Sequence, residues 1–264
     1  MTDLEYFSHP ALSASKITQI LRSPYDYFND IRIESKSLDF GSIVHKLVLE
    51  SNLDALFNGQ KVVIEREFGD LRSKAAREEK EAFYAKHCND YVVPKEAFEC
   101  AKTLLESDLG AFFQYKGVRE KPYFDKVLGR EFKCKPDFFL ENFKYGKDNV
   151  NLCIDLKTCT SNTEKSFMQS VISYGYHIQA YVYSKILKAD SFLFITIEKG
   201  TNNIACYYLD SAWFEKAESD IKEAFEILDN KEKYNKKVRV FKDENNELTL
   251  IKKLDMPLYL AKVY

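Results

Sequence analysis

The chain has 264 residues, of which 45% are hydrophobic and 30% are charged. That composition excludes an intrinsically disordered or fibrous protein, and the length suffices for one large domain or two small ones with a substantial core. Lys and Arg total 39 against 41 Asp and Glu, a formal net charge of -2. This charge argues against a protein that coats nucleic acid or membrane through its overall charge, but a single basic cleft is compatible with it.

Targeting and cysteine patterns predict a soluble cytoplasmic protein. Residues 1–5 carry two acids and no basic segment ahead of an apolar stretch, so no secretory signal is expected. The longest apolar run, residues 192–197, has the length of a strand and is too short to cross a bilayer, so no membrane contact is expected. The six cysteines form no C-x-x-C pair, which favours reduced thiols over a zinc ribbon or an iron–sulfur cluster.

Helical periodicity dominates the N-terminal part of the chain. Apolar residues recur at helical spacing between residues 12 and 21, where Ser13 or Ser15 is a suitable N-cap, and Pro24 is expected to end this helix. Further helices are predicted at residues 25–31, 40–50, 73–87 and 94–105, with one strand among them at residues 61–64.

Short strand-like runs separated by turn residues follow. Three strands of a meander are predicted at residues 122–124, 131–139 and 152–156, with turns at Gly129-Arg130 and Tyr145-Gly146. After them we expect a helix or helix pair at residues 163–187, a hairpin of strands 192–197 and 204–209 around a Gly/Asn turn, and a last helix at residues 212–228.

The order of these elements predicts a single α/β domain in which helices flank a mixed sheet. We expect this domain to span residues 1–230. Residues 231–264 are predicted to form a Lys-rich C-terminal extension that contacts DNA or another subunit.

Two acids and a lysine form the pattern with the clearest chemistry. Asp137 is expected at a strand end, and Asp155 and Lys157 alternate along another strand, so their side chains project from the same face. The eighteen-residue separation of the two aspartates is enough for a strand, a turn and the return strand. Converging carboxylates favour Mg²⁺ or Mn²⁺, and Lys157 would orient an attacking water or stabilise developing charge.

Four other side chains are candidates for the same site, each with an ordinary structural alternative. His45 lies at the margin of an apolar helical stripe and is either a metal ligand or a half-buried histidine bonded to a carbonyl. Gln179 and Tyr183 share one helical face with Tyr176, which suits phosphate or water binding but also ordinary packing. Glu120 is either an additional acid or a solvated glutamate at a strand end.

The order of these motifs resembles the RecE-type 5′-3′ exonucleases (exodeoxyribonuclease VIII-like), which belong to the PD-(D/E)xK nuclease superfamily. The resemblance covers about residues 10–210. It rests on six motifs in sequence order, namely Leu12-Ser13-Ala14-Ser15, Phe40-Gly41-x-x-x-His45 with Leu49-Glu50, Glu120, Lys135-Pro136-Asp137, Asp155-Leu156-Lys157-Thr158, and Tyr174-Gly175-Tyr176-His177-Ile178-Gln179-Ala180-x-x-Tyr183.

The resemblance implies a PD-(D/E)xK nuclease core, a central mixed β-sheet flanked by helices, with a bound Mg²⁺ for which Mn²⁺ substitutes. It implies that His45, Asp137, Asp155 and the main-chain carbonyl of Leu156 are the metal ligands. By the same resemblance Lys157 handles the attacking water. The remaining implied roles are support of the site by Gln179 and Tyr183, and an additional acid at Glu120.

The activity implied by the resemblance is 5′-to-3′ degradation of one strand of linear double-stranded DNA. The product is a 3′ single-stranded tail, which a single-strand annealing protein uses in homologous recombination, in bacterial or phage-infected cytoplasm. Members of that family form rings, so a homo-oligomer is expected, a tetramer in preference to a trimer.

Three alternative functions stay open on the same fold. These are a PD-(D/E)xK endonuclease, a helicase-associated nuclease, and a non-catalytic protein that binds DNA ends. The helicase-associated branch often carries an iron–sulfur cluster with cysteines near the C-terminus, and here no cysteine follows Cys206. Non-catalytic members usually lose the lysine or an aspartate, but Asp137, Asp155 and Lys157 are all present.

Overall fold

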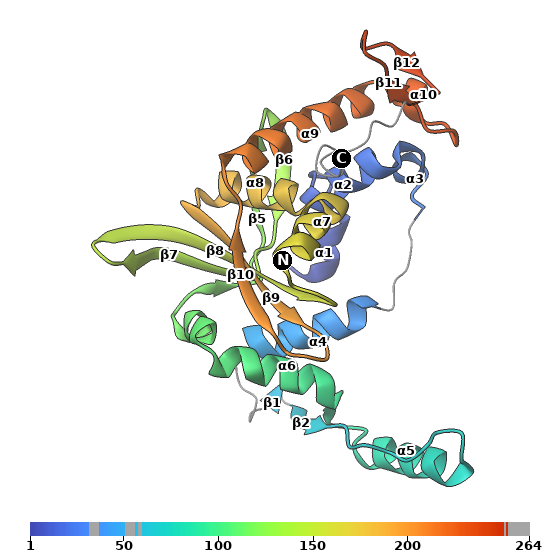
Figure 1. Ribbon diagram of the computed structural model, residues 1–264, viewed down its shortest axis with the longest axis vertical. Helices are drawn as coiled ribbons and strands as arrows, with labels where there is room; N and C mark the ends of the chain where they lie inside the picture. Colours follow the sequence, from blue (N-terminus) through green and yellow to red (C-terminus); the bar gives the residue numbers. More distant parts are fainter. Residues whose placement is uncertain (32–36, 51–55, 58–59, 251, 253–264) are drawn as a thin grey trace, which may run out of the picture.

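A five-stranded mixed sheet forms the centre of the protein (Figure 1). The computed structural model describes residues 1–31, 37–50, 56–57, 60–250 and 252. The sheet has the order β10-β9-β8-β7-β4 and consists of β4 (Val118–Arg119), β7 (Phe138–Tyr145), β8 (Asp148–Cys159), β9 (Ser191–Glu198) and β10 (Ile204–Tyr208). Strands β8 and β9 are parallel and the other neighbours are antiparallel, which confirms the predicted mixed α/β fold.

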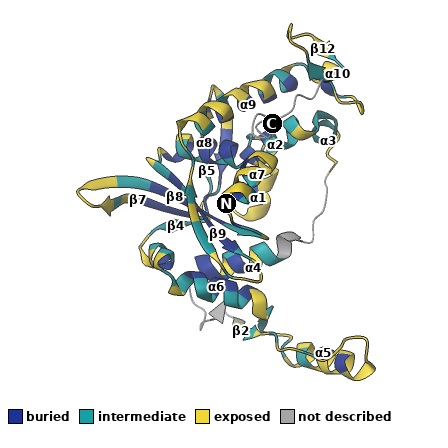
Figure 2. Ribbon diagram, in the orientation of Figure 1, coloured by how far each residue is buried: buried dark blue, intermediate teal, exposed yellow. Residues whose placement is uncertain are grey.

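Helices cover both faces of this sheet. On one face lie α4 and α6, and on the other lies α8, backed by α2 and α9. The helices are α1 (Asp3–Ser8), α2 (Ala14–Arg22), α3 (Pro24–Phe28), α4 (Ser37–Leu49), α5 (Lys74–Lys86), α6 (Lys95–Glu106), the 3-10 helix η1 (Asp108–Gln114), α7 (Glu164–Tyr174), α8 (Tyr176–Leu187), α9 (Ser211–Asp229) and α10 (Lys231–Tyr234). Figure 2 shows that buried residues concentrate in the sheet and these flanking helices, whereas α5 lies apart and is mostly exposed.

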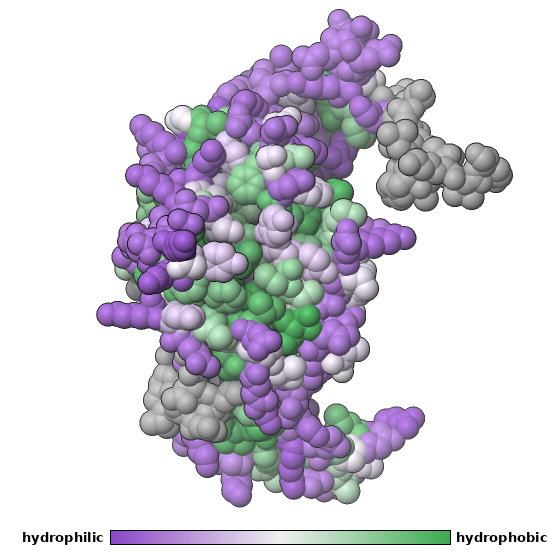
Figure 3. All heavy atoms as spheres, turned by 60° about the vertical axis from the view of Figure 1, so that its left-hand side comes forward, coloured by the Kyte–Doolittle hydropathy of each residue, from purple (hydrophilic) through white to green (hydrophobic). Residues whose placement is uncertain are grey.

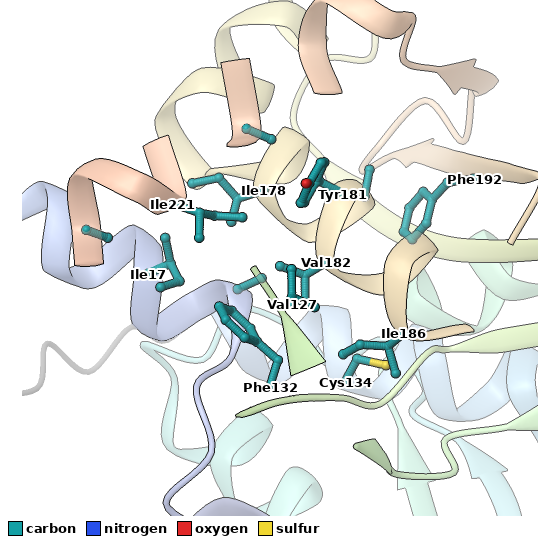
Figure 4. Close-up of a cluster of buried hydrophobic side chains, with 14 of the residues drawn as sticks. Ile17, Val127, Phe132, Cys134, Ile178, Tyr181, Val182, Ile186, Phe192 and Ile221 are labelled. Carbon is teal, nitrogen blue, oxygen red and sulfur yellow. The ribbon is translucent and has the colours of Figure 1, made fainter. Parts of the chain in front are cut away.

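The alternation of side chains along β8 divides the core into two clusters. Leu152, Ile154 and Leu156 are buried against α4 and α6, whereas Cys153 belongs to the cluster around α2, α8 and α9. Figure 4 shows the second cluster, where residues such as Val182 lie between the helices and the strands beneath them. Asp155 therefore projects on the α8 side of the sheet, because it alternates with its hydrophobic neighbours.

Most predicted helices begin and end where the sequence signals indicate. Ser13 caps α2, and its side chain accepts a hydrogen bond from the Lys16 N–H. Pro24, predicted to end this helix, also opens α3 as its first residue, and Ser23 is the cap that both helices share. The predicted segment 163–187 is a pair of helices, α7 and α8, joined at Gly175.

The prediction of one strand over residues 131–139 is wrong. Two strands occupy this stretch, β6 (Arg130–Cys134) and β7, and residues 135–137 separate them. β6 pairs with β5 (Tyr123–Val127) in a separate two-stranded sheet, so the three predicted strands do not form one meander. The physical reason is Pro136, which has no N–H for a ladder hydrogen bond and lets the chain leave one sheet and enter the next.

Several short elements lie outside the predictions. They are β1 (Leu56–Phe57) and β3 (Tyr91–Val93), which flank the predicted strand β2 (Gln60–Ile64), together with α1, η1, β4, α10, β11 (Phe241–Lys242) and β12 (Leu248–Thr249). Elements of two to seven residues carry too few periods for a hydrophobic pattern.

Among the described residues, no helix combines the length and the apolar character that a bilayer crossing requires.

On the face shown in Figure 3, hydrophobic side chains gather across the middle of the molecule and hydrophilic ones cover its two ends.

Candidate functional site

The two aspartates meet where β7 begins and β8 continues past it. The ladder between these strands reaches Phe138, which lies opposite Ile154. Beyond that point the Asp137 side chain takes the place of the main-chain acceptor, and its Oδ2 accepts a hydrogen bond of 2.8 Å from the Leu156 N–H. Because the N–H and C=O of one strand residue point to the same edge, the Leu156 carbonyl also faces Asp137. The break at Pro136 thus places an acid beside the second half of β8.

Asp155 is the most buried polar group of the site, with 2% of its surface exposed. Its Oδ1 accepts a hydrogen bond of 2.5 Å from Gln179 Nε2, and its Oδ2 lies 2.6 Å from the ammonium of Lys157. Among the described residues, no group makes a well-aligned hydrogen bond to this Oδ2. Asp155 therefore keeps an oxygen that is held only by charge.

His45 reaches the site from α4. Its Nδ1 lies 3.4 Å from Asp137 Oδ2, and its side chain is 28% exposed. Burial alone would lower the pKa of His45, but the adjacent Asp137 carboxylate raises it above the ordinary value. The structure therefore brings together His45, Asp137, Asp155, Lys157 and Gln179, as the sequence predicts.

The face of α8 contributes two aromatic side chains of different kinds. The Tyr176 ring lies with its centroid 4.7 Å from the Lys157 ammonium, a cation–π contact. The Tyr183 hydroxyl donates a 3.5 Å hydrogen bond to the Lys135 carbonyl and so braces the segment that carries Asp137. Tyr183 supports the site through the main chain, whereas Tyr176, for which the sequence predicts no catalytic role, contacts the lysine itself.

Gly175 sets the corner between α7 and α8 from which this face is presented. Its φ is +69°, in the left-handed region that favours glycine, and a Cβ there would lie 2.2 Å from Thr18 Oγ1. The helix after the corner begins at once with Tyr176, and Gln179 follows one turn later. Close packing against α2 therefore fixes where the glutamine lies.

Replacement of Gly175 by alanine is expected to destabilise the fold by about 1–3 kcal/mol, because the methyl group overlaps Thr18 in a tightly packed corner. Chemical denaturation measures this change. Gly146→Ala is the matched control, since Gly146 also has a positive φ (+62°) but no atom lies within 4 Å of the added Cβ. Equal losses in the two variants would show that the contact with Thr18 is unimportant.

Glu120 lies beside this group of side chains. Its nearest charged contact is Lys135, at 3.6 Å, and its side chain is 43% exposed. Its N–H donates to the carbonyl of Pro136, at 3.0 Å, and lies 3.4 Å from the carbonyl of Asp137, so its backbone adjoins the segment that carries the first aspartate. The carboxylate instead lies near Glu50, whose pKa is raised by burial and by the charge of Glu120.

Burial and neighbouring charges shift the pKa values of the central groups in different directions. Burial raises the pKa of Asp155 to about 6. Burial also acts to raise the pKa of Asp137, but His45 and Lys157 hold it below its ordinary value. The pKa of Lys157 is raised, because the two carboxylates outweigh the effect of burial. Lys157 is thus an ammonium group at neutral pH and donates hydrogen bonds.

The donor atoms of the site suit a hard divalent cation. Carboxylate and carbonyl oxygens are the preferred ligands of Mg²⁺, and Asp155 Oδ2 has a lone pair that no aligned donor occupies. The Lys157 ammonium beside this oxygen marks a place where positive charge is stabilised. Within the described chain, no three His, Cys, Asp or Glu side chains form a ready-made ligand cluster. Metal binding therefore requires a main-chain ligand or a rearrangement of Lys157.

An acid ahead of one strand, an acid and a lysine alternating on the next, and a glutamine from the following helix define the class of PD-(D/E)xK nuclease folds. The chain belongs to the family described as a PDDEXK-like domain of unknown function (DUF3799), which matches residues 13–239. That match includes every candidate site residue.

Similarity to a candidate exonuclease of known structure supports the same fold. A candidate exonuclease from Eubacterium rectale is similar over 100% of this chain and 98% of its own, with a TM-score of 0.56 and 13% identity. An alkaline exonuclease from Laribacter hongkongensis aligns over 85% and 90% of the two chains, with a TM-score of 0.32 and 11% identity. A phage-related exonuclease from Haemophilus somnus 129PT covers 87% and 98%, with a TM-score of 0.35 and 12% identity. No curated protein matches the sequence.

Proposed function

We propose that this protein is a metal-dependent exonuclease that degrades one strand of linear double-stranded DNA from the 5′ end. The observation that carries the proposal is the convergence of Asp137, Asp155 and Lys157 at one end of β8, with Gln179 bonded to the second acid. Membership of the PDDEXK-like family and the fold shared with a candidate exonuclease support hydrolysis of a phosphodiester.

Each side chain has a defined part in that chemistry. Asp137, Asp155 and the Leu156 carbonyl, with His45, would hold Mg²⁺, or Mn²⁺ in its place, and a bound ion supplies charge stabilisation at the phosphoryl oxygen. Lys157, a proton donor held by Asp155 and Tyr176, orients the attacking water or stabilises the developing negative charge. Gln179 fixes the Asp155 carboxylate by bonding its other oxygen.

The proposed biological setting is homologous recombination. The product would be a 3′ single-stranded tail for a single-strand annealing protein, and the active form would be a ring-shaped homo-oligomer, a tetramer in preference to a trimer. The support for this setting is the sequence resemblance to RecE-type exonucleases, and gel filtration with light scattering tests the oligomer.

The deciding experiment supplies the protein with Mg²⁺ and three DNA substrates, linear duplex, circular duplex and single strand, each strand labelled at one end. Loss of label from the 5′ ends of linear duplex, with circular duplex intact, is the expected result. Cleavage of circular DNA would replace the proposal with an endonuclease, and retention of every label with tight binding of ends would indicate a non-catalytic protein.

Mg²⁺ is expected to raise the melting temperature more near pH 8 than near pH 5. Between its unfolded pKa of 3.8 and its folded value of about 6, Asp155 holds a proton in the folded state that it lacks when unfolded. The contribution of Asp155 to the stability of the metal-free fold therefore falls by about 3 kcal/mol as pH rises through this window, and a cation offsets that loss only where Asp155 is ionised.

Thermal melting with and without ~1 mM Mg²⁺ at the two pH values measures this difference. Ca²⁺ and K⁺ serve as controls for hard-cation and ionic-strength effects. A melting temperature that responds equally at both pH values would contradict the assignment of the cation to Asp155.

A further inference from the structure

A cleft of about 830 Å³ opens beside the site, lined by residues from the end of β8, from α4 and from α7. The basic side chains among its described lining residues are His45, Lys157 and Lys199. Among the described residues that line it, none is Asp or Glu, although these acids make up 41 of the 264 residues in the chain. Each of these basic groups has a carboxylate beside it, but none of those acids lines the cleft. The charged groups that face the cleft are therefore basic and suit an anionic ligand.

One wall of the cleft is a helical face of hydroxyl groups. Ser166, Ser170 and Ser173 recur at intervals of four and three along α7, and all three line the cleft. The Ser166 hydroxyl accepts a hydrogen bond from Thr163 Oγ1, at 3.0 Å, so its own proton is directed elsewhere. Thr158 lines the wall formed by β8. The Ser170 hydroxyl donates to the Ser166 carbonyl, at 3.1 Å, so its proton is used within the helix. Neutral hydroxyl donors such as Ser166 bind phosphate oxygens without reading a base sequence.

The far end of the cleft carries a second cation. The backbone N–H of Lys199 donates to the Cys159 carbonyl, so Lys199, which follows the last residue of β9, lies next to the end of β8. Its ammonium lies 4.5 Å from the Phe40 ring centroid and 3.5 Å from a Glu96 carboxylate oxygen on α6. Both members of this ion pair are nearly half exposed, so the pair is weak and the lysine is available to an anion in the cleft.

An exposed aromatic ring borders the same cleft. Tyr174 is the last residue of α7 and is 65% exposed, an unusual exposure for a tyrosine beside a buried charged site. Its ring centroid lies 5.6 Å from that of Tyr176, which in turn covers Lys157. An aromatic platform next to a positively charged groove is the combination that binds single-stranded nucleic acid, because any base can stack on the ring.

We propose that this cleft binds a single strand of DNA next to the phosphate to be cleaved. The hydroxyl wall and Lys199 hold its phosphates, and Tyr174 stacks against one base regardless of its identity. The volume lies within the usual range of small-ligand sites, about 300–1,000 Å³. One strand of a few nucleotides fits such a space. The proposal deepens the proposed function and rests on it.

Binding of a short fluorescent oligothymidylate, measured by anisotropy in EDTA so that no cleavage occurs, tests the cleft. Tyr174→Ala is expected to weaken binding roughly 5- to 150-fold, the loss of one base stacked on an aromatic ring. Tyr174→Phe should bind like the unmodified protein, because the ring is kept. Tyr145→Ala is the matched control, since Tyr145 is 72% exposed on the β7–β8 hairpin and is not part of the cleft. Melting curves confirm that all variants are folded.

Two results would overturn the proposal. One is binding that is equally strong in Tyr174→Ala, and the other is an oligonucleotide that the unmodified protein fails to bind. A preference of more than about tenfold between oligothymidylate and oligoadenylate would overturn the sequence-independent stacking, because every base has a face that can stack on the ring. The end-labelled cleavage experiment is separate. Cleavage of duplex DNA with unaffected binding in Tyr174→Ala would refute the cleft alone, whereas Tyr174-dependent binding without cleavage would refute only the proposed function.

Discussion

Replacement of Lys157 by alanine is expected to lower the turnover of DNA hydrolysis by roughly 10²–10³-fold, the usual cost of removing one group that stabilises developing charge. The Lys157 ammonium lies 2.6 Å from Asp155 Oδ2 and 4.7 Å from the centroid of the Tyr176 ring. Among the described residues, no other side chain occupies this position. The loss should fall on turnover rather than on DNA binding, because the charge acts at the reacting phosphate.

Single-turnover kinetics with labelled linear duplex, together with DNA binding in EDTA, separate the two effects. Lys144→Ala is the matched control, since Lys144 is an exposed lysine on the β7–β8 hairpin. An active Lys157→Ala protein would remove the role assigned to this lysine, and equal losses in Lys144→Ala would indicate a nonspecific effect of charge.

Asp155→Asn is expected to abolish the stabilisation by Mg²⁺ and to reduce turnover at least about 100-fold, which is the upper end of losses for residues that merely orient a metal ligand. The substitution keeps the shape of the side chain and leaves an oxygen for the hydrogen bond from Gln179. It removes the negative charge that would attract the cation.

Melting curves across a Mg²⁺ titration and the same single-turnover assay measure both parts of this expectation. Asp148→Asn, an exposed aspartate at the start of the same strand, is the control and should respond to Mg²⁺ as the unmodified protein does. A full Mg²⁺ response in Asp155→Asn would place the metal elsewhere.

The local parts of the site are predictable from sequence because they depend on fixed periods. The two-residue spacing of Asp155 and Lys157 puts both on one face of a strand, and their ion pair follows directly. The helical spacing of Tyr176, Gln179 and Tyr183 likewise predicts a shared face. Such spacing does not predict which contact each side chain makes. The Tyr176 ring contacts Lys157, whereas the Tyr183 hydroxyl donates to the Lys135 carbonyl.

Contacts between distant segments are less accessible from sequence. Pro136 is visible in the sequence, yet its effect, the passage from one sheet to another, depends on which strands pair with β6 and β7. Nothing in the sequence distinguishes Lys133, in the same stretch, from an ordinary lysine on a strand. It is 3% exposed, and its ammonium donates to the carbonyls of Tyr6 and His9 at the end of α1. Neither partner lies near it in the sequence, so no periodicity reveals the contact.

The positions of the site residues along the chain have a consequence for biosynthesis. His45 and Asp137 meet across about a third of the chain, and Gln179 joins them only after α7 has formed and turned at Gly175. Contacts of such long sequence separation form late, because the intervening loop must close first. A nascent chain on the ribosome therefore carries Asp155 and Lys157 before it can assemble the site. The candidate site is therefore among the last parts of the fold to assemble.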